Sequence, residues 1–459
     1  MTQERGAEGK NVGRDRDQYQ DRIQAWLEAV PMRMRSLAFL RAQSSPVYLV
    51  GGSVRDALLG RPAHDMDLVI DGDALHLTRA LADHLDAAFV PMDVERDVGR
   101  VAWHDAKGVQ YVDLAGFRAS TLTGDLLARD FTANAIAVPL MPTVGFLIDP
   151  AHGKEDIAQR LLRATTPQVF VNDPLRILRG LRQSGALGFG IETGTEQLMR
   201  SGRHGLSRVS PERIRDELFQ IAELPDSAAV LARGAEIGVW EIVFVQAETS
   251  DEGRRIAGRL DGVMNGLKAG ANGPLGSYVT QLERHWSAYT AAERSRGTLL
   301  KLVAWLGSWM DDDKALCALK GLHLSRRELA IAEYTLQAQS DDRFWLDLAC
   351  VSDLDLYRYF RAYGDAGLDG AVLWWTTRGA PHNAPRLDLL FDAWFCRHET
   401  VIDPPALVNG RDLIVQAGLS PGPLLGETLE AIRQAQVQGR VTSREQALDY
   451  ARRKGAGAP

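Results

Sequence analysis

A short apolar segment that runs into two glycines constrains the fold of this chain more than any other feature. Residues 47–50 read VYLV and lead into Gly51 and Gly52, a helical pattern follows, and residues 67–70 read DLVI. Two glycines permit a tight turn and a close backbone approach to a phosphate, and the next helix presents free N–H groups to an anion. Arg55 adds a cation one turn into that helix. Glycine pairs before helices are more often structural turns than phosphate sites. The segment therefore predicts a strand–turn–helix–strand unit, and its glycine turn is a candidate phosphate site.

Two aspartates, Asp65 and Asp67, open the second strand. Alternate residues of a strand point to the same face, with Cα atoms about 6.5–7 Å apart. Two carboxylates placed in this way can share divalent cations about 3.5–4 Å apart, the arrangement that serves in-line displacement at phosphorus. The alternative is a solvated pair at a sheet edge, but the apolar residues 68–70 and the nearby glycine turn argue against it. The sequence therefore predicts Asp65 and Asp67 as metal ligands.

Arginines gather in the middle of an otherwise acidic chain, whose formal net charge is −7. Residues 160–215 contain ten arginines and no lysine, against four acidic residues. Arg176, Arg179 and Arg182 recur at every third position, so they form one stripe on a helix, with Asp173 expected one turn earlier on the same side. Aspartate accepts from exocyclic amines and arginine donates to base acceptors, so such a stripe can read a cytosine or adenine edge. The alternative is a ladder of surface salt bridges.

The segment GGSVRDALLG…DMDLVI resembles the signature of the polymerase-β-like nucleotidyltransferases. More narrowly, it is similar to the class II tRNA nucleotidyltransferases and their bacterial poly(A) polymerase relatives. Four later segments resemble family motifs in the same order, over about 170 residues in all: ARDFTANAIAV (128–138), DPAHGKEDI (149–157), NDPLRILRGLRQSGALGFGIE (172–192) and SPERIRDELFQI (210–221). The resemblance implies a template-independent enzyme that adds C and/or A residues to the 3′ end of tRNA, with CTP and/or ATP as substrates and Mg²⁺ as cofactor.

The resemblance also implies roles for single residues. Asp65 and Asp67 would hold the metals, and Asp113, in the strand pattern at 109–117, is the candidate third catalytic carboxylate. Asp173 and Arg176 would select the base, although Asn172 stands where family members often carry an acidic residue. The residues expected to bind the nucleotide are Gly51, Gly52, Arg55, Arg129, Asp130, Asn134, Asp173, Arg176, Arg179 and Arg182.

Hydrophobic periodicity predicts an α+β chain, with strands and helices in its first part and helices only in the rest, and the resemblance implies that the first part is a polymerase-β-like head. Helices are expected at 22–43 and 73–86, and the strand patterns, which extend to 133–140 and 145–150, predict a mixed sheet of about five strands. After Pro174 the strand signal disappears. The expected parts are a flexible N-terminal tail (1–20), the catalytic head (21–170), a base-reading helical neck (171–240), a helical body (241–400) and a helical, tRNA-binding tail (401–459).

The length of one loop bears on which nucleotides are added. Only ten residues, ASTLTGDLLA, separate Arg118 from Arg129. CCA-adding relatives usually carry a longer flexible loop here, and a shortened loop resembles that of CC-adding enzymes. The sequence favours CC addition, with full CCA addition, A addition and poly(A) synthesis as alternatives. A catalytically inactive RNA-binding protein is the rival from another class.

The body resembles the HD-type domain of some bacterial relatives around residues 300–328. Gly307 and Ser308 stand where a metal-dependent HD hydrolase needs an adjacent His-Asp pair, so we expect an HD-like fold without hydrolase activity. Residues 404–450 resemble the C-terminal segment of the same enzymes and would dock the tRNA elbow.

Three dispersed cysteines form no CxxC pair, and no run approaches the roughly 18 apolar residues of a membrane helix. The sequence therefore predicts a cytoplasmic protein with no membrane partner.

Overall fold

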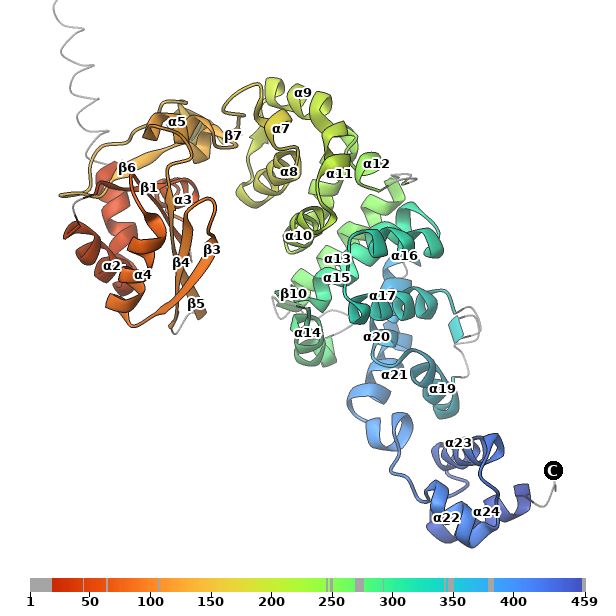
Figure 1. Ribbon diagram of the computed structural model, residues 1–459. Coiled ribbons are helices and arrows are strands. Elements are labelled where there is room, and N and C mark those ends of the chain that lie inside the picture. Colours follow the sequence, from red (N-terminus) through yellow and green to blue (C-terminus); the bar gives the residue numbers. More distant parts are fainter. Residues whose placement is uncertain are drawn as a thin grey trace, which may run out of the picture. The chain divides into compact units, whose positions relative to one another are not determined.

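The computed structural model describes residues 19–43, 45–62, 65–105, 108–244, 247, 251–268, 276–291, 293–341, 344–345, 351–378 and 384–455. The chain divides into two compact units, one of Met1–Val209 with Ile237–Ile242 and one of Ser210–Glu236 with Val243–Pro459 (Figure 1). The division into five parts stays a prediction. Residues 1–18 of the expected N-terminal tail lie outside the described residues.

A six-stranded mixed sheet forms the centre of the first unit, one strand more than the sequence suggested. Its order is β3-β4-β5-β2-β1-β6, and only the central pair β2–β5 is parallel. The strands are β1 (Val47–Val50), β2 (Asp65–Ile70), β3 (Ala88–Asp93), β4 (Val98–Asp105), β5 (Gly108–Gly116) and β6 (Ala137–Pro139). The helices before and between them are α2 (Pro31–Arg41), α3 (Gly52–Leu58) and α4 (Ala74–Leu85).

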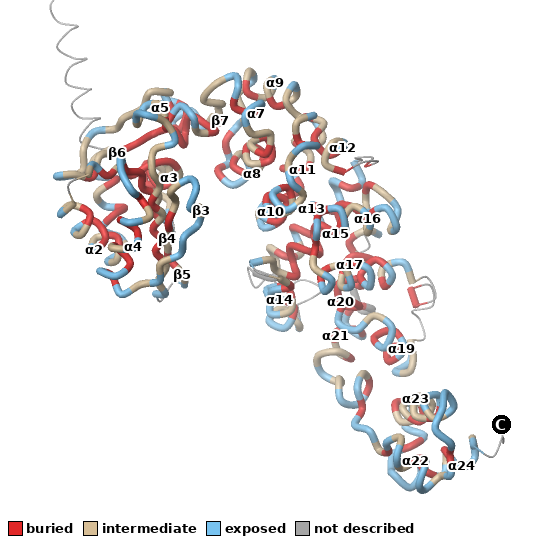
Figure 2. Tube along the Cα trace, in the orientation of Figure 1, coloured by how far each residue is buried: buried red, intermediate tan, exposed pale blue. Residues whose placement is uncertain are grey.

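The two faces of the sheet carry different layers. A Cβ on Gly99 of β4 would lie 2.8 Å from Oγ1 of Thr78, so α4 packs on the face that also carries Leu68 and Leu114. The opposite face carries Asp67 and a small apolar cluster that contains Val50. The strands β1 and β2 are buried along most of their length (Figure 2). The aspartate pair therefore lies on the face that α4 leaves uncovered.

Four local predictions were wrong. The expected helix at 22–43 is two helices, because Pro31 begins α2 and proline cannot continue a helix through that point. The strand expected at 133–140 starts as a 3₁₀ turn, η1 (Thr132–Asn134), and the one at 145–150 is a single bridge between Ile148 and Ala137. Strands also recur after Pro174: β8 (Gly190–Ile191) pairs with β7 (Leu161–Leu162), and β9 (Tyr289–Ala291) pairs with β10 (Arg294–Ser295).

The rest of the first unit packs against the turn that follows Asp130. Phe131 is fully buried against Phe170 of α7, with ring centroids 6.3 Å apart. A Cβ on Gly180 of α8 would lie 2.8 Å from the Phe131 ring, so glycine lets α8 approach closely. The helices of this part are α5 (Leu122–Leu127), α6 (Gly153–Gln159), α7 (Val169–Asn172), α8 (Arg176–Leu187), α9 (Thr193–Gly202) and η2 (Arg203–Arg208).

The second unit is helical around α15 (Arg296–Trp309), which is buried along most of its length. Within the described residues no helix is long and apolar enough to cross a membrane. The helix α12 (Trp240–Val243) spans the boundary, with all but its last residue in the first unit. The other helices of the second unit are α10 (Pro211–Ala222), α11 (Ser227–Ile237), α13 (Asp251–Lys268), η3 (Gly276–Tyr278), α14 (Val279–Ser287), α16 (Asp312–Gly321), α17 (Arg326–Gln339), α19 (Asp353–Tyr363), α20 (Ala366–Arg378), α21 (Ala384–Phe395), η6 (His398–Ile402), α22 (Gly410–Ala417), α23 (Pro423–Val437) and α24 (Arg444–Gly455).

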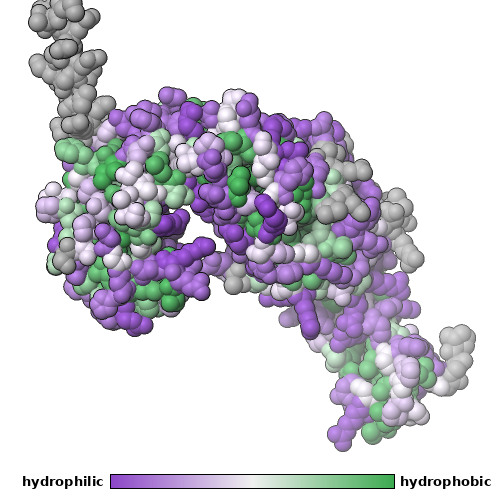
Figure 3. Space-filling model, turned by 45° about the horizontal axis from the view of Figure 1, so that its top comes forward, coloured by the Kyte–Doolittle hydropathy of each residue, from purple (hydrophilic) through white to green (hydrophobic). Residues whose placement is uncertain are grey.

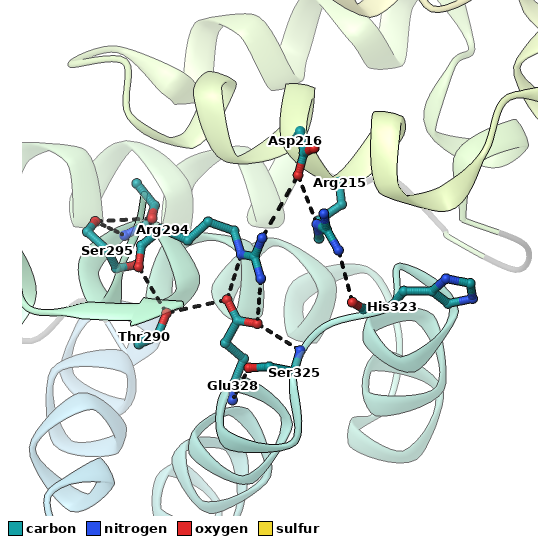
Figure 4. A network of polar contacts seen from close by, with 9 residues as sticks. Arg215, Asp216, Thr290, Arg294, Ser295, His323, Ser325 and Glu328 are labelled. Carbon is teal, nitrogen blue, oxygen red and sulfur yellow. Dashed lines mark hydrogen bonds and ion pairs between the residues drawn. The ribbon is translucent and has the colours of Figure 1, made fainter. Parts of the chain in front are cut away.

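A polar network ties α10 to the helices that follow it (Figure 4). Glu328, fully buried at the start of α17, accepts from Arg294 at 2.7 and 3.0 Å and closes a capping box with Ser325. Arg215 of α10 donates to the carbonyl of His323 at 3.0 Å. Asp216 of α10 lies 2.9 Å from Arg215 and 4.0 Å from Arg294, so ion pairs link α10 to the same network within the second unit.

The last three helices enclose a core of their own. Leu413, Ile432 and Ala447, one from each helix, are buried in it. The turn between α22 and α23 and its flanks leave apolar side chains exposed, Val415 and Leu424 among them, and the surface there shows hydrophobic areas between hydrophilic ones (Figure 3). This segment is the one expected to dock RNA.

Candidate functional site

The Gly51–Gly52 turn lies between two guanidinium groups. Gly51 has a φ of 68° and a ψ of −133°, a conformation that favours glycine. A Cβ on Gly51 would lie 2.8 Å from Nη1 of Arg129, and one on Gly52 would lie 3.4 Å from Nη2 of Arg55. Arg55 is held by the side-chain oxygens of Asn134 at 2.6 Å and of Asp56 at 2.8 Å. The turn thus combines missing side chains with two oriented cations, which suits a phosphate chain.

Asp65 and Asp67 share one face of β2. Met66 between them is fully buried on the other face, as strand alternation requires. The backbone N–H of Asp67 donates to Ser53 Oγ at 2.8 Å, which fixes the strand to the first turn of α3. The same two hypothetical Cβ atoms on the glycines would lie 3.9 and 3.7 Å from Oδ2 of Asp67. The carboxylate therefore lies directly beside the glycine turn.

Asp113 lies next to this pair. The parallel register places it opposite Asp67, and the antiparallel register places Arg100 opposite Asp113. Arg100 donates to both carboxylate oxygens of Asp113, at 2.7 and 2.8 Å. The sheet thus brings Asp65, Asp67 and Asp113 together. Arg100, which was not identified from the sequence, neutralises the charge of Asp113.

The electrostatics at Asp67 favour a cation. Burial, followed by the charge of Asp113, raises the pKa of Asp67 to about 6. Among the described residues no group of three His, Cys, Asp or Glu side chains could hold a metal ion. Mg²⁺ does not need such a cage, because it commonly takes one or two carboxylates together with substrate phosphates and water. Asp65 and Asp67, beside a turn whose shape and charge suit a phosphate chain, fit that ligand set.

The raised pKa predicts a pH-dependent cost to stability in the absence of metal. The folded state binds the Asp67 proton more tightly than the unfolded state, so this residue's contribution to stability falls as the pH rises from about 4 to about 6. In EDTA at pH 8, Asp67→Asn should therefore be more stable than the wild type, by about 1–3 kcal/mol. Thermal melts between pH 4.5 and 8 measure the difference, which should shrink to about a third of its value by pH 4.5. A difference that does not change with pH would contradict the assignment.

Asp130 organises a buried network behind the turn. It accepts from Asn134 Nδ2 at 3.0 Å and from Arg179 Nε at 3.1 Å, and Asn134 also donates to Gln183 at 2.8 Å. Burial opposes ionisation of Asp130, but the Arg179 charge and the hydrogen bond from Asn134 keep its pKa below the ordinary value. Gln183 was not identified from the sequence, although it lies four residues after Arg179 and so shares its helix face.

The expected base-reading pair is placed differently from the prediction. Asp173 follows α7 in extended conformation and accepts from the N–H of Leu175 at 3.2 Å, so it precedes α8 and is not part of that helix. Arg176, the first residue of α8, donates to the carbonyl of Ala128 at 3.0 Å. Arg182 lies half-buried on the same helix. Arg176 and Arg179 thus both contact the segment 128–130, next to the glycine turn.

Three family models match successive parts of the chain. A family model described as "Poly A polymerase head domain" matches residues 47–163. The model "Probable RNA and SrmB- binding site of polymerase A" matches residues 188–249, and one for tRNA nucleotidyltransferase domain 2 matches residues 310–451. The matches follow the order of the motifs along the chain.

Relatives match along almost the whole chain. A CC-adding tRNA nucleotidyltransferase of Geobacter sulfurreducens is 31% identical over 93% of this chain and 95% of its own length. A CC-adding tRNA nucleotidyltransferase of Synechocystis is 29% identical over 89% and 93%. Other relatives are named as CCA-adding and A-adding enzymes. Among solved structures, a CCA-adding enzyme in complex with ATP has the same fold, with a TM-score of 0.70 at 22% identity over 90% of this chain and 93% of that one.

Proposed function

The chain belongs to the tRNA nucleotidyltransferase family, and on this premise we propose that it adds two cytidylates to the 3′ end of tRNA from CTP, without a template. The observation that carries the proposal is the pair Asp65 and Asp67 on one strand face beside the Gly51–Gly52 turn, with Arg55 and Arg129 at that turn. Full CCA addition, A addition and poly(A) synthesis are the alternatives within the same chemistry.

Each group of site residues has its own part in phosphoryl transfer. The reaction depends mostly on positioning and charge neutralisation. Asp65 and Asp67 would hold Mg²⁺, which when bound neutralises phosphate charge and lowers the pKa of the attacking 3′-hydroxyl. Arg55 and Arg129 neutralise the triphosphate at the turn, where the glycines leave room for it. The 3′-oxygen attacks the α-phosphorus in line, and pyrophosphate leaves on the side of Gly52.

The elements behind the turn hold the base. Asp130 and Asn134 fix α8 through Arg179 and Gln183, so the start of that helix lies beside the triphosphate site. Arg176, at this start, and Asp173, just before it, read the base edge. Arg179 and Arg182 lie on the same helix and contribute positive charge for the phosphates.

Two observations favour CC addition. The segment from Arg118 to Arg129 is short and ordered, because α5 is capped by Thr121 and tied at both ends to Asp125. Two CC-adding relatives are 31% and 29% identical over 93% and 89% of the chain, whereas a CCA-adding and an A-adding relative are 27% and 28% identical over 86% and 88%. A site closed by a fixed segment of this kind is less able to reshape itself for ATP after the second cytidylate.

Incubation with three tRNAs that end before C74, after C74-C75, or with complete CCA, each with a single labelled nucleotide, tests the proposal. We expect two cytidylates on the first tRNA and no AMP on the second. Adenylate on the second tRNA would identify an A- or CCA-adding enzyme, and long A tails would identify a poly(A) polymerase. No incorporation into any of them, with tRNA still bound, would favour the inactive RNA-binding protein.

The remaining parts are proposed to serve the RNA. We propose that α22–α24 dock the tRNA elbow and that the HD-like body has no hydrolase activity; hydrolysis of 2′,3′-cyclic nucleotides would overturn the second point. Cys317 and Cys396 are free and exposed, as expected in a reducing cytoplasm, and Cys350 lies outside the described residues.

A further inference from the structure

Asp125 is a buried carboxylate to which the mechanism above assigns no role. Its side chain is completely buried, in the middle of the short helix α5. Oδ1 accepts from the backbone N–H of Arg118 at 3.0 Å, and Oδ2 accepts from Nε and Nη2 of Arg129 at 3.2 and 3.0 Å. A single buried acid therefore fixes two arginines that are eleven residues apart in the sequence.

The geometry of this contact decides where Arg129 points. Asp125 engages one edge of the guanidinium, through Nε and Nη2, and the remaining nitrogen, Nη1, is the atom nearest to a Cβ built on Gly51. The Arg129 side chain is only 14% exposed, and its two charge-assisted hydrogen bonds to one carboxylate oxygen fix the orientation of the guanidinium. Without Asp125 the long arginine side chain would have several rotamers available, and only the charge of Asp67 would draw it towards the turn.

We infer that Asp125 is a positioning residue, which holds Arg129 over the Gly51–Gly52 turn and thereby sets the affinity of the enzyme for the triphosphate of the incoming nucleotide. The inference rests on the proposed function, because it deepens the role of the same site. Asp125 does not touch the substrate and acts through Arg129. Asp125 also accepts from the backbone N–H of Arg118, at the other end of the α5 segment. One carboxylate therefore holds both this segment and Arg129, the cation proposed to bind the triphosphate.

The test compares Asp125→Ala, Arg129→Ala and the double variant, with inorganic tripolyphosphate as the probe in buffer containing Mg²⁺. Asp125→Ala should weaken tripolyphosphate binding and raise KM for CTP by about tenfold or more, with KM for tRNA little changed. In the Arg129→Ala background the same change should have less than about a twofold effect, because the group that Asp125 positions is already gone. Asp125→Asn, which keeps the shape and the contact with Arg118, should fall between the wild type and Asp125→Ala.

A matched control separates positioning from stability. Asp261→Asn removes another buried carboxylate, which accepts from Ser227 and pairs with Lys301 in the second unit, and it should leave tripolyphosphate affinity unchanged whatever its effect on melting temperature. Equal effects of Asp125→Ala with and without Arg129, or unchanged tripolyphosphate affinity in both Asp125 variants, would overturn the inference. The binding measurement does not depend on catalysis, so a wild type that binds the probe without transferring nucleotides would refute the proposed function alone.

Discussion

Replacing Asp65 by alanine should reduce nucleotide incorporation by about three orders of magnitude or more while leaving tRNA affinity nearly unchanged. Asp65 and Asp67 lie on one face of β2, and a metal held by them provides several kcal/mol of charge stabilisation in the transition state. At about 1.4 kcal/mol for each factor of ten, that loss corresponds to an almost inactive enzyme. Single-turnover incorporation of labelled CMP measures the rate, and gel-shift titration measures tRNA binding.

The neighbouring surface provides the control for Asp65→Ala. Asp71 lies just beyond the end of β2 and is exposed, so Asp71→Ala removes the same charge from the same region without touching the site. It should keep near-normal incorporation. Mn²⁺ binding, followed by electron paramagnetic resonance in the presence of CTP, should be weakened by Asp65→Ala and by Asp67→Asn but not by Asp71→Ala. Near-normal incorporation by Asp65→Ala would falsify the metal assignment.

The second large effect concerns Gly153, the first residue of α6. A Cβ at this position would overlap the carbonyl oxygen of Thr132 and lie 2.6 Å from its carbonyl carbon. Thr132 is buried at the start of η1, which contains Asn134, and it donates to Asp156 of α6 at 2.7 Å. Backbone atoms of a buried turn cannot move aside as the end of a flexible side chain can. Gly153→Ala should therefore destabilise the first unit by about 3 kcal/mol or more.

Differential scanning calorimetry of the full chain would detect this loss as a fall in melting temperature of about 6–12 °C for the first unit. Gly190→Ala is the matched control, because Gly190 is an exposed residue of β8 whose added Cβ would lie 3.8 Å from its nearest neighbour, Leu161. It should change the melting temperature little. A Gly153→Ala protein as stable as the control would show that α6 and η1 do not pack as described.

The sequence predicted the parts of the site that depend on local rules. Alternation along a strand places Asp65 and Asp67 on one face, and a glycine pair after an apolar strand marks the turn beside them. The helical stripe of arginines in α8 was also readable from spacing. Local rules did not place Asp173, because the chain leaves α7 in extended conformation before α8 begins, and a helix boundary of this kind has no periodic signal.

What the sequence determined by itself is the family, the strand with its two acidic residues and the glycine turn, because these follow from side-chain alternation and backbone freedom within a few residues. Only the tertiary structure decided that Asp113 lies opposite Asp67 and is neutralised by Arg100, since strands far apart in the sequence meet there in a register set by the whole sheet. It also decided the raised pKa of Asp67 and the position of Arg129 beside Gly51, because burial and the convergence of distant side chains exist only once the chain is packed.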